Sequence, residues 1–178
     1  MVGAAPALHD RLGANGFIDA RVSRQFDEGI HVVHDLHAQG RLGRVVIIHL
    51  GDNGPIKPEQ MDQMMGELAG VPHVLFVTVR VDRSWQGEVN QTIVDASHRY
   101  TTITVVDWYG YSAPHGDWFA SDGTHVNNKS ANAYADFVVG SVPPEPTTTT
   151  AAPPPTTAMT PSTAAERRTP ATARRSTT

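Results

Sequence analysis

The pair Asp122 and His125 is the part of this sequence best suited to moving a proton. Their separation of three residues lets one turn of chain bring the carboxylate to one ring N–H of the imidazole, which leaves the other ring nitrogen free as a general base. The same residues also fit a plain turn with a solvated histidine, because Gly123 and Thr124 lie between them. The spacing alone leaves both interpretations open.

A second group that could act on a reacting carbonyl lies in the segment Gly51-Asp52-Asn53-Gly54. Aspartate, asparagine and glycine favour turns, so a structural loop is one interpretation. The other is that Asn53 presents its side-chain amide to an oxyanion that develops during acyl transfer, where one such donor is worth a few kcal/mol. A site requires both groups in one place, and that depends on the fold.

Apolar runs rich in β-branched residues predict three buried strands, at residues 44–50, 73–79 and 101–106. Residues 17–22 (FIDARV) alternate between apolar and polar types, which is typical of a half-buried strand. Helical periodicity is found over residues 4–12, 25–39, 58–68, 85–99 and 129–139. Ser84 is expected to cap the fourth of these helices.

This alternation predicts an α/β domain, a three-layer α/β/α sandwich with a parallel sheet, flavodoxin-like in outline. In such sheets the chemistry lies beyond the carboxyl ends of the strands. The expected places for a site are the loops after the predicted strands, which end at Val22, Leu50, Val79 and Val106. Asn53 lies in one of these loops, and Asp122 and His125 follow the last strand before the final helix.

The segments HLGDNG, WFASDGTHV and IDARVSRQ together resemble the SGNH (GDSL-like) hydrolase family. They are most similar to the domains of bacterial cell-wall and polysaccharide O-acetyltransferases. The resemblance implies that Asn53 donates to the oxyanion hole and that Asp122 orients His125, which acts as the base. It also implies that the backbone N–H of Ser23 completes the hole, at a position where the family usually has glycine. No metal or organic cofactor is implied.

The first motif of that family, Gly-Asp-Ser at the end of the first strand, is absent from this sequence. Residues 1–8 resemble the stretch that directly follows the serine, so the first strand and the nucleophile are expected upstream of Met1. In the strand order of such folds the first strand lies between the second and the third. The sheet is therefore expected to lack a central strand, and the chain as written is expected to be inactive.

The resemblance implies a serine ester hydrolase or an O-acyltransferase that acts on an acyl ester, with an acetylated carbohydrate or cell-wall component as the substrate. A different class of protein is also open: a non-catalytic remnant or binding module from a truncated gene, since the nucleophile is absent. A flavodoxin-like nucleotide binder is disfavoured because no Gly-rich phosphate loop follows a first strand.

The composition of the chain changes at Pro143. From there to residue 178 Pro, Thr, Ala and Arg dominate, which predicts a disordered tail after a folded domain at residues 1–142. The tail holds four arginines and two glutamates, so it carries +2 and the remainder of this −4 chain carries −6. An acidic domain argues against nucleic acid as a partner. With no cysteine, disulfides and thiolate zinc sites are excluded.

The sequence shows no apolar run as long as a membrane span and no signal-peptide pattern at its start. The family resemblance nevertheless implies an extracytoplasmic domain of a longer protein, in which a membrane acyltransferase domain precedes this one.

The histidines His31, His34 and His37 are spaced three apart on one predicted helix. Because no carboxylate cluster completes a zinc set, a solvated helix face is favoured over a metal site.

Five aromatic residues crowd the connection that leads to the Asp122–His125 pair. They are Trp108, Tyr109, Tyr111, Trp118 and Phe119. Packing beneath this connection is the favoured interpretation, and a contact surface for an acyl group or a sugar is the alternative.

Overall fold

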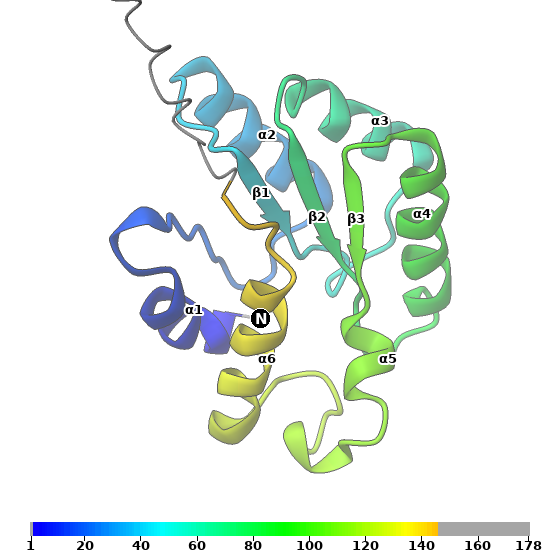
Figure 1. The fold of residues 1–178 in the computed structure, drawn as a ribbon. Helices are drawn as coiled ribbons and strands as arrows, with labels where there is room; N and C mark the ends of the chain where they lie inside the picture. The colour runs from blue at the N-terminus through cyan, green and yellow to red at the C-terminus, as the bar shows by residue number, and fades with distance from the viewer. Residues whose placement is uncertain (1, 146–178) are drawn as a thin grey trace, which may run out of the picture. The chain divides into compact units, whose positions relative to one another are not determined.

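Three parallel strands form the centre of the protein, in the computed structural model that describes residues 2–145. The sheet has the order β1-β2-β3 (Figure 1), and its strands are β1 Val45–Ile48, β2 His73–Val77 and β3 Ile103–Val106. Each predicted apolar run contains one of them. One compact unit ends at Pro144. The tail predicted from Pro143 lies, from residue 146 on, outside the described residues.

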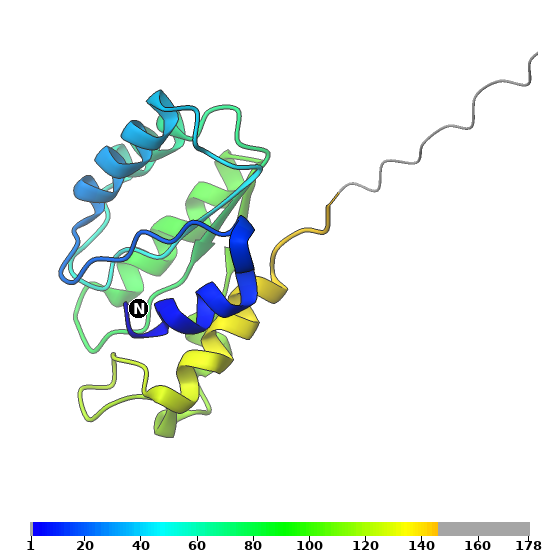
Figure 2. The same cartoon turned by 90° about the vertical axis from the view of Figure 1, so that its left-hand side faces the viewer.

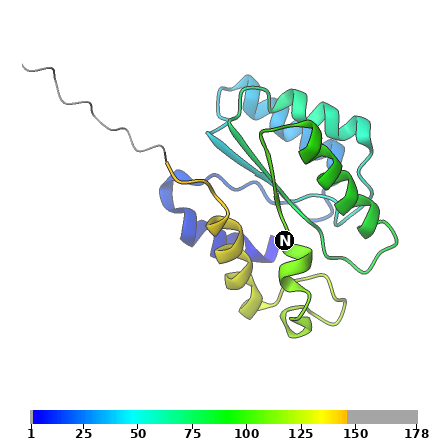
Figure 3. The same cartoon turned by 45° about the vertical axis from the view of Figure 1, so that its right-hand side comes forward.

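Helices connect and flank the strands: α1 Ala5–Leu12, α2 Phe26–Ala38, α3 Pro58–Glu67, α4 Gln86–Arg99, α5 Trp108–Ser112 and α6 Asn128–Gly140. Three short 3-10 turns lie at Val2–Ala4, Gly13–Asn15 and Gly116–Trp118. One side of the sheet is covered by α2, α3 and α4, and the other by α1 and α6 (Figures 1 and 3). Among the described residues no helix is both long enough and apolar enough to cross a membrane.

Strand β2 shows why the layers form. Val74 and Phe76 point into the core shared with α2, α3 and α4, whereas Leu75 and Val77 point into the core shared with α1 and α6. All four side chains are buried, and each contributes roughly 1.5–3 kcal/mol by leaving water. Residues 74–77 are apolar at every position, as expected for a strand covered on both faces, and the predicted three-layer α/β/α sandwich is confirmed.

The helices α1 and α6 lie side by side on their face of the sheet (Figure 2). Arg11 of α1 joins them, because its guanidinium donates to Asn132 at 2.9 Å and to Asp136 at 2.8 Å. Val2–Ala4 also contacts α6. The start of the described chain is thereby held against the helix that follows His125.

The strand predicted over residues 17–22 is wrong. These residues form a loop without regular structure that leads to α2, and the side chains of Phe17 and Val22 are 60% and 72% exposed. Alternation produces a strand only where a neighbouring strand takes up the backbone N–H and C=O groups. Within residues 2–145 only β2 pairs with β1, and residues 17–22 do not join the open edge of β1, so they take part in no ladder.

Two smaller differences concern helix starts. Trp85, not Ser84, is the N-cap residue of α4, and it makes no side-chain cap. Helix α5 forms in the connection after β3, where no helical periodicity was found in the sequence, because the Asp107 side chain caps it by accepting the Gly110 N–H at 2.9 Å. The burial of Trp108 then fixes this short helix against the core.

Candidate functional site

A cavity of about 320 Å³ lies at the carboxyl ends of the strands. Its lining comes from three connections: the loop after β1, the loop after β2 and the segment before α6. The lining residues are Asp52, Asn53, Val81, Arg83, Trp85, Asp122, Thr124 and His125. Three of the four predicted site residues therefore line one cavity, although up to 72 positions separate them in the chain. Ser23 does not line it.

Asp122 and His125 form the contact that their spacing predicts. One oxygen of the Asp122 carboxylate accepts a hydrogen bond from Nδ1 of the His125 ring at 2.7 Å. Its other oxygen accepts the backbone N–H groups of Thr124 and His125 at 2.9 and 3.0 Å. Gly123, with φ of 68°, supplies the left-handed backbone that closes this turn. With Nδ1 engaged, Nε2 is the ring nitrogen left to take a proton.

These three donors keep the Asp122 carboxylate ionised. The backbone N–H of His125, that of Thr124 and the His125 ring together lower the pKa of Asp122 far below its ordinary value. A carboxylate that stays charged favours an imidazole with its proton on Nδ1. That is the tautomer a general base requires if Nε2 is to accept.

The lowered pKa of Asp122 predicts how Asp122→Asn affects stability. A depressed pKa in the folded state contributes stability above the unfolded pKa of about 3.9, and this contribution is lost as the pH falls through the folded value. The wild type is therefore expected to melt above Asp122→Asn at neutral pH, with the difference shrinking below pH of about 4. Melting curves from neutral to acid pH measure this. Asp117→Asn, another exposed carboxylate, is the matched control. A carboxyl carbon of Asp122 that titrates near 3.9 by NMR contradicts the prediction.

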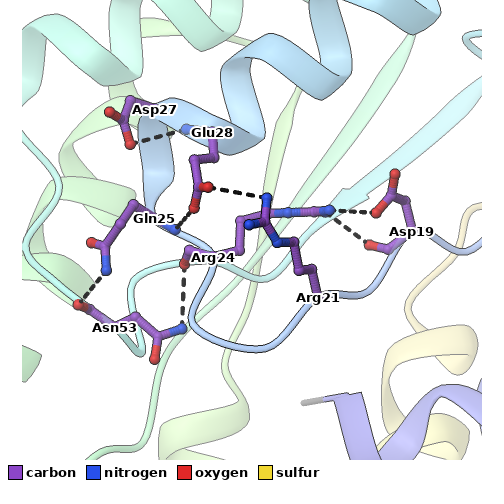
Figure 4. A network of polar contacts seen from close by, with 7 residues as sticks. All are labelled: Asp19, Arg21, Arg24, Gln25, Asp27, Glu28 and Asn53. Carbon is purple, nitrogen blue, oxygen red and sulfur yellow. Dashed lines mark hydrogen bonds and ion pairs between the residues drawn. The ribbon is translucent and has the colours of Figure 1, made fainter.

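Asn53 is tied to the loop that carries Ser23 (Figure 4). Its side-chain amide donates to the Arg24 carbonyl at 3.3 Å, and its own backbone carbonyl accepts the side-chain amide of Gln25 at 3.0 Å. Gln25 in turn caps α2, where its backbone N–H donates to Glu28 at 2.8 Å. Although Ser23 does not line the cavity, its loop is therefore bonded directly to Asn53.

Ser23 has a φ of 58°, the one positive value at a non-glycine residue in the described part of the chain. Holding a serine in this region costs on the order of 1–3 kcal/mol. Flanking contacts offset that cost: Arg24 pairs with Asp19 at 2.5 Å, and Glu28 pairs with Arg21 at 3.1 Å (Figure 4). The backbone at Ser23 thus has a conformation that glycine adopts more easily than serine.

Close packing fixes the loop that precedes Asn53. Gly51 has a φ of 114°, and a Cβ there would lie 2.6 Å from a methyl group of Val89. The Gly51 carbonyl accepts the indole N–H of Trp85 at 3.1 Å, which joins the loop after β1 to the loop after β2. No larger residue fits at Gly51.

Other residues of this region were not predicted from the sequence. Asp52, Arg83 and Trp85 line the cavity, and His49 lies buried behind Asp52. The rule that sites gather at the carboxyl ends of strands could have singled out Arg83 and Trp85, which follow β2. His49 directly follows β1 and begins the segment HLGDNG, but nothing in the sequence links it to a distant partner.

The histidines of α2 contact a carboxylate of the neighbouring helix. The Nδ1 atoms of His34 and His37 lie 3.0 and 3.8 Å from the same oxygen of Glu67 in α3. No group of three or more His, Cys, Asp or Glu side chains able to hold a metal ion occurs within residues 2–145. The five aromatic residues before Asp122 differ in exposure, and Trp118 is partly buried and stacked on Trp108. Trp108 and Phe119 are buried in the core, whereas Tyr109 and Tyr111 are 45% exposed.

Known proteins with similar sequences are O-acetyltransferases. No protein-family model matches the chain. O-acetyltransferase OatA of Staphylococcus aureus (strain NCTC 8325 / PS 47) is 30% identical over 126 residues, which is 70% of this chain. YrhL of Bacillus subtilis (strain 168) is 29% identical over 126 residues, or 71% of the chain. The chain spans about a fifth of the length of these relatives.

A solved structure shares the fold. It is the C-terminal catalytic domain of peptidoglycan O-acetyltransferase A (OatA) from Streptococcus pneumoniae, with a methylsulfonyl adduct. The TM-score is 0.69 at 21% identity, and the match covers 78% of this chain and 85% of the other. The family resemblance seen in the sequence is thereby confirmed: the chain is a homologue of the OatA-type O-acetyltransferases and has the SGNH-type fold of their catalytic domain.

Proposed function

We propose that this chain provides most of an SGNH-type active site that transfers or hydrolyses acetyl esters of a cell-wall carbohydrate. The observation that carries the proposal is the single cavity that brings Asn53 to the Asp122–His125 pair. His125 acts as the base through Nε2, and Asp122 orients it. Asn53 and the backbone N–H of Ser23 stabilise the oxyanion. The homology to O-acetyltransferases supports the same chemistry.

The reaction follows from these positions once a serine supplies the nucleophile. The serine hydroxyl gives its proton to Nε2 of His125 while its oxygen bonds to the acyl carbon. The carbonyl oxygen becomes an oxyanion that receives N–H donors from Asn53 and Ser23. Collapse of this intermediate expels the alcohol, which takes the proton from His125. A water or a sugar hydroxyl then attacks the acyl-enzyme by the same steps in reverse order.

We propose that this serine belongs to a Gly-Asp-Ser segment before Met1. Two observations support this: the chain contains no Gly-Asp-Ser, and the turn Val2–Ala4 passes the segment that carries the base. A Cβ built on Gly3 would lie 3.9 Å from the carbonyl oxygen of Val126, the residue after His125. A segment that runs into Val2 would deliver its serine beside His125. Without it, the chain as written is expected to be almost inactive.

The experiment compares two proteins on 4-nitrophenyl acetate. One is the chain as written. The other is extended by the codons before Met1, or by a grafted first strand that ends in Gly-Asp-Ser. The extended protein is expected to hydrolyse the ester with a burst of acyl-enzyme, and the serine→Ala version of it is expected to be inactive. A folded extended protein with no more activity than the chain as written would favour the non-catalytic binding module.

We further propose that the domain works on the cell-wall side of the membrane, within a longer protein that also holds a membrane acyltransferase domain. The relatives support this proposal because they are about five times longer than the matched segment. The donor of the acetyl group would then come from the other domain, and a wall sugar would be the acceptor.

A further inference from the structure

A buried histidine lies behind the loop of Asn53. His49 directly follows β1, and its side chain is 7% exposed. Its Nδ1 lies 2.5 Å from the hydroxyl of Tyr134, which comes from α6 on the other side of the site. The Tyr134 side chain is buried as well, against the edge of Trp108.

This contact selects one tautomer of His49. Burial, and then the negative charge of Asp52, raises the pKa of Tyr134, so the phenol keeps its proton. A buried hydroxyl must donate that proton to an acceptor, and Nδ1 of His49 is the acceptor within reach. Nδ1 therefore carries no hydrogen, and the proton of the neutral ring lies on Nε2.

The protonated side of His49 faces the cavity wall. Its Nε2 is buried, has no hydrogen-bond partner within the described chain and lies 3.7 Å from an oxygen of Asp52. That distance exceeds a direct hydrogen bond, but the N–H dipole still stabilises a charge at Asp52. Burial opposes the ionisation of Asp52, yet the pKa of this carboxyl is lowered overall. The carboxylate next to Asn53 is thus held in its charged form.

We propose that His49 is a positioning residue: held by Tyr134, it directs Nε2–H at the Asp52 carboxylate and so fixes the loop that presents Asn53. The relay from Tyr134 through His49 to Asp52 joins the helix after His125 to the loop after β1. It therefore maintains the separation between the base and the oxyanion donor. The catalytic consequence rests on the proposed function, whereas the relay itself is a property of the folded chain.

The first test uses NMR on the chain as written. Long-range nitrogen–proton correlations of His49 are expected to show a neutral ring protonated at Nε2. Tyr134→Phe, which removes one hydroxyl, is expected to change this pattern and to shift the side-chain amide resonances of Asn53. Tyr100→Phe is the matched control, because the Tyr100 hydroxyl bonds Asp62 at 2.9 Å, away from the cavity. An Nδ1-protonated ring, or an Asn53 amide that Tyr134→Phe leaves in place, overturns the proposal.

The second test measures kinetics in the serine-containing protein. Tyr134→Phe is expected to lower kcat about tenfold with little change in KM, since small displacements of catalytic groups cost up to a hundredfold. Tyr100→Phe is expected to leave both constants unchanged. An unchanged kcat in folded Tyr134→Phe contradicts the positioning role. If the serine-containing protein has no activity at all, the proposed function fails, and the NMR result still decides on the relay.

Discussion

In the protein that carries the Gly-Asp-Ser serine, His125→Ala is expected to lower the rate of acetyl-ester hydrolysis by about four to six orders of magnitude, the range for losing one member of a catalytic triad. Without the imidazole, no group takes the serine proton during attack, and none returns it to the leaving alcohol. The oxyanion donors remain, so a small rate above the reaction in water should survive.

The measurement is kcat/KM for 4-nitrophenyl acetate, followed by single-turnover kinetics of acylation. His98→Ala is the matched control, because His98 is an exposed histidine near the end of α4. That variant is expected to keep the full rate. If His125→Ala folds normally and retains its activity, His125 is not the base, and the geometry of the Asp122 turn serves structure alone.

Asn53→Ala should reduce kcat by roughly a hundredfold to a thousandfold with a smaller change in KM, as expected when one oxyanion donor is removed. The expectation depends on a loop that survives the substitution. The 3.0 Å bond from Gln25 goes to the backbone carbonyl of Asn53, so alanine retains it. The bond from the amide to the Arg24 carbonyl is lost, but at 3.3 Å it is a long one.

Kinetics on a series of acyl esters separates this role from simple binding. A donor that acts on the oxyanion affects kcat for every ester that shares the carbonyl, whereas a binding contact changes KM. Gln91→Ala on the exposed face of α4 serves as the control for loss of an amide side chain. A variant of Asn53 that raises KM and leaves kcat intact would place the residue in substrate binding instead.

Local patterns in the sequence predicted the parts of the molecule that depend on local chemistry. Residues 74–77 of β2 are all apolar because both faces of the strand are covered, so the strand was recognisable. Asp122 and His125 were recognisable because their contact spans a single turn. The alternation of residues 17–22 was misleading, since whether it forms a strand depends on a neighbouring strand that no residue in the segment encodes.

Long-range contacts account for the rest. His49 and Tyr134 are separated by 85 positions, and no local pattern links the two residues, so their hydrogen bond could not be predicted. The left-handed backbone at Ser23 could not be predicted either, because a serine in the sequence does not indicate a positive φ. The contacts of the neighbouring Arg24 and Gln25 hold Ser23 in this conformation.

Because β1 is an edge strand, a complete catalytic domain can in principle be assembled from two separate polypeptides. Within residues 2–145 only one side of β1 is paired, and the side chains of Val45, Val46 and Ile47 are half-buried. An unpaired edge accepts a further strand from any chain that matches it, including one that is not covalently attached. A synthetic peptide that ends in Gly-Asp-Ser could therefore dock there as a separate fragment. Catalysis would then follow a saturation curve in peptide concentration, and the serine would behave as an exchangeable ligand of the fold.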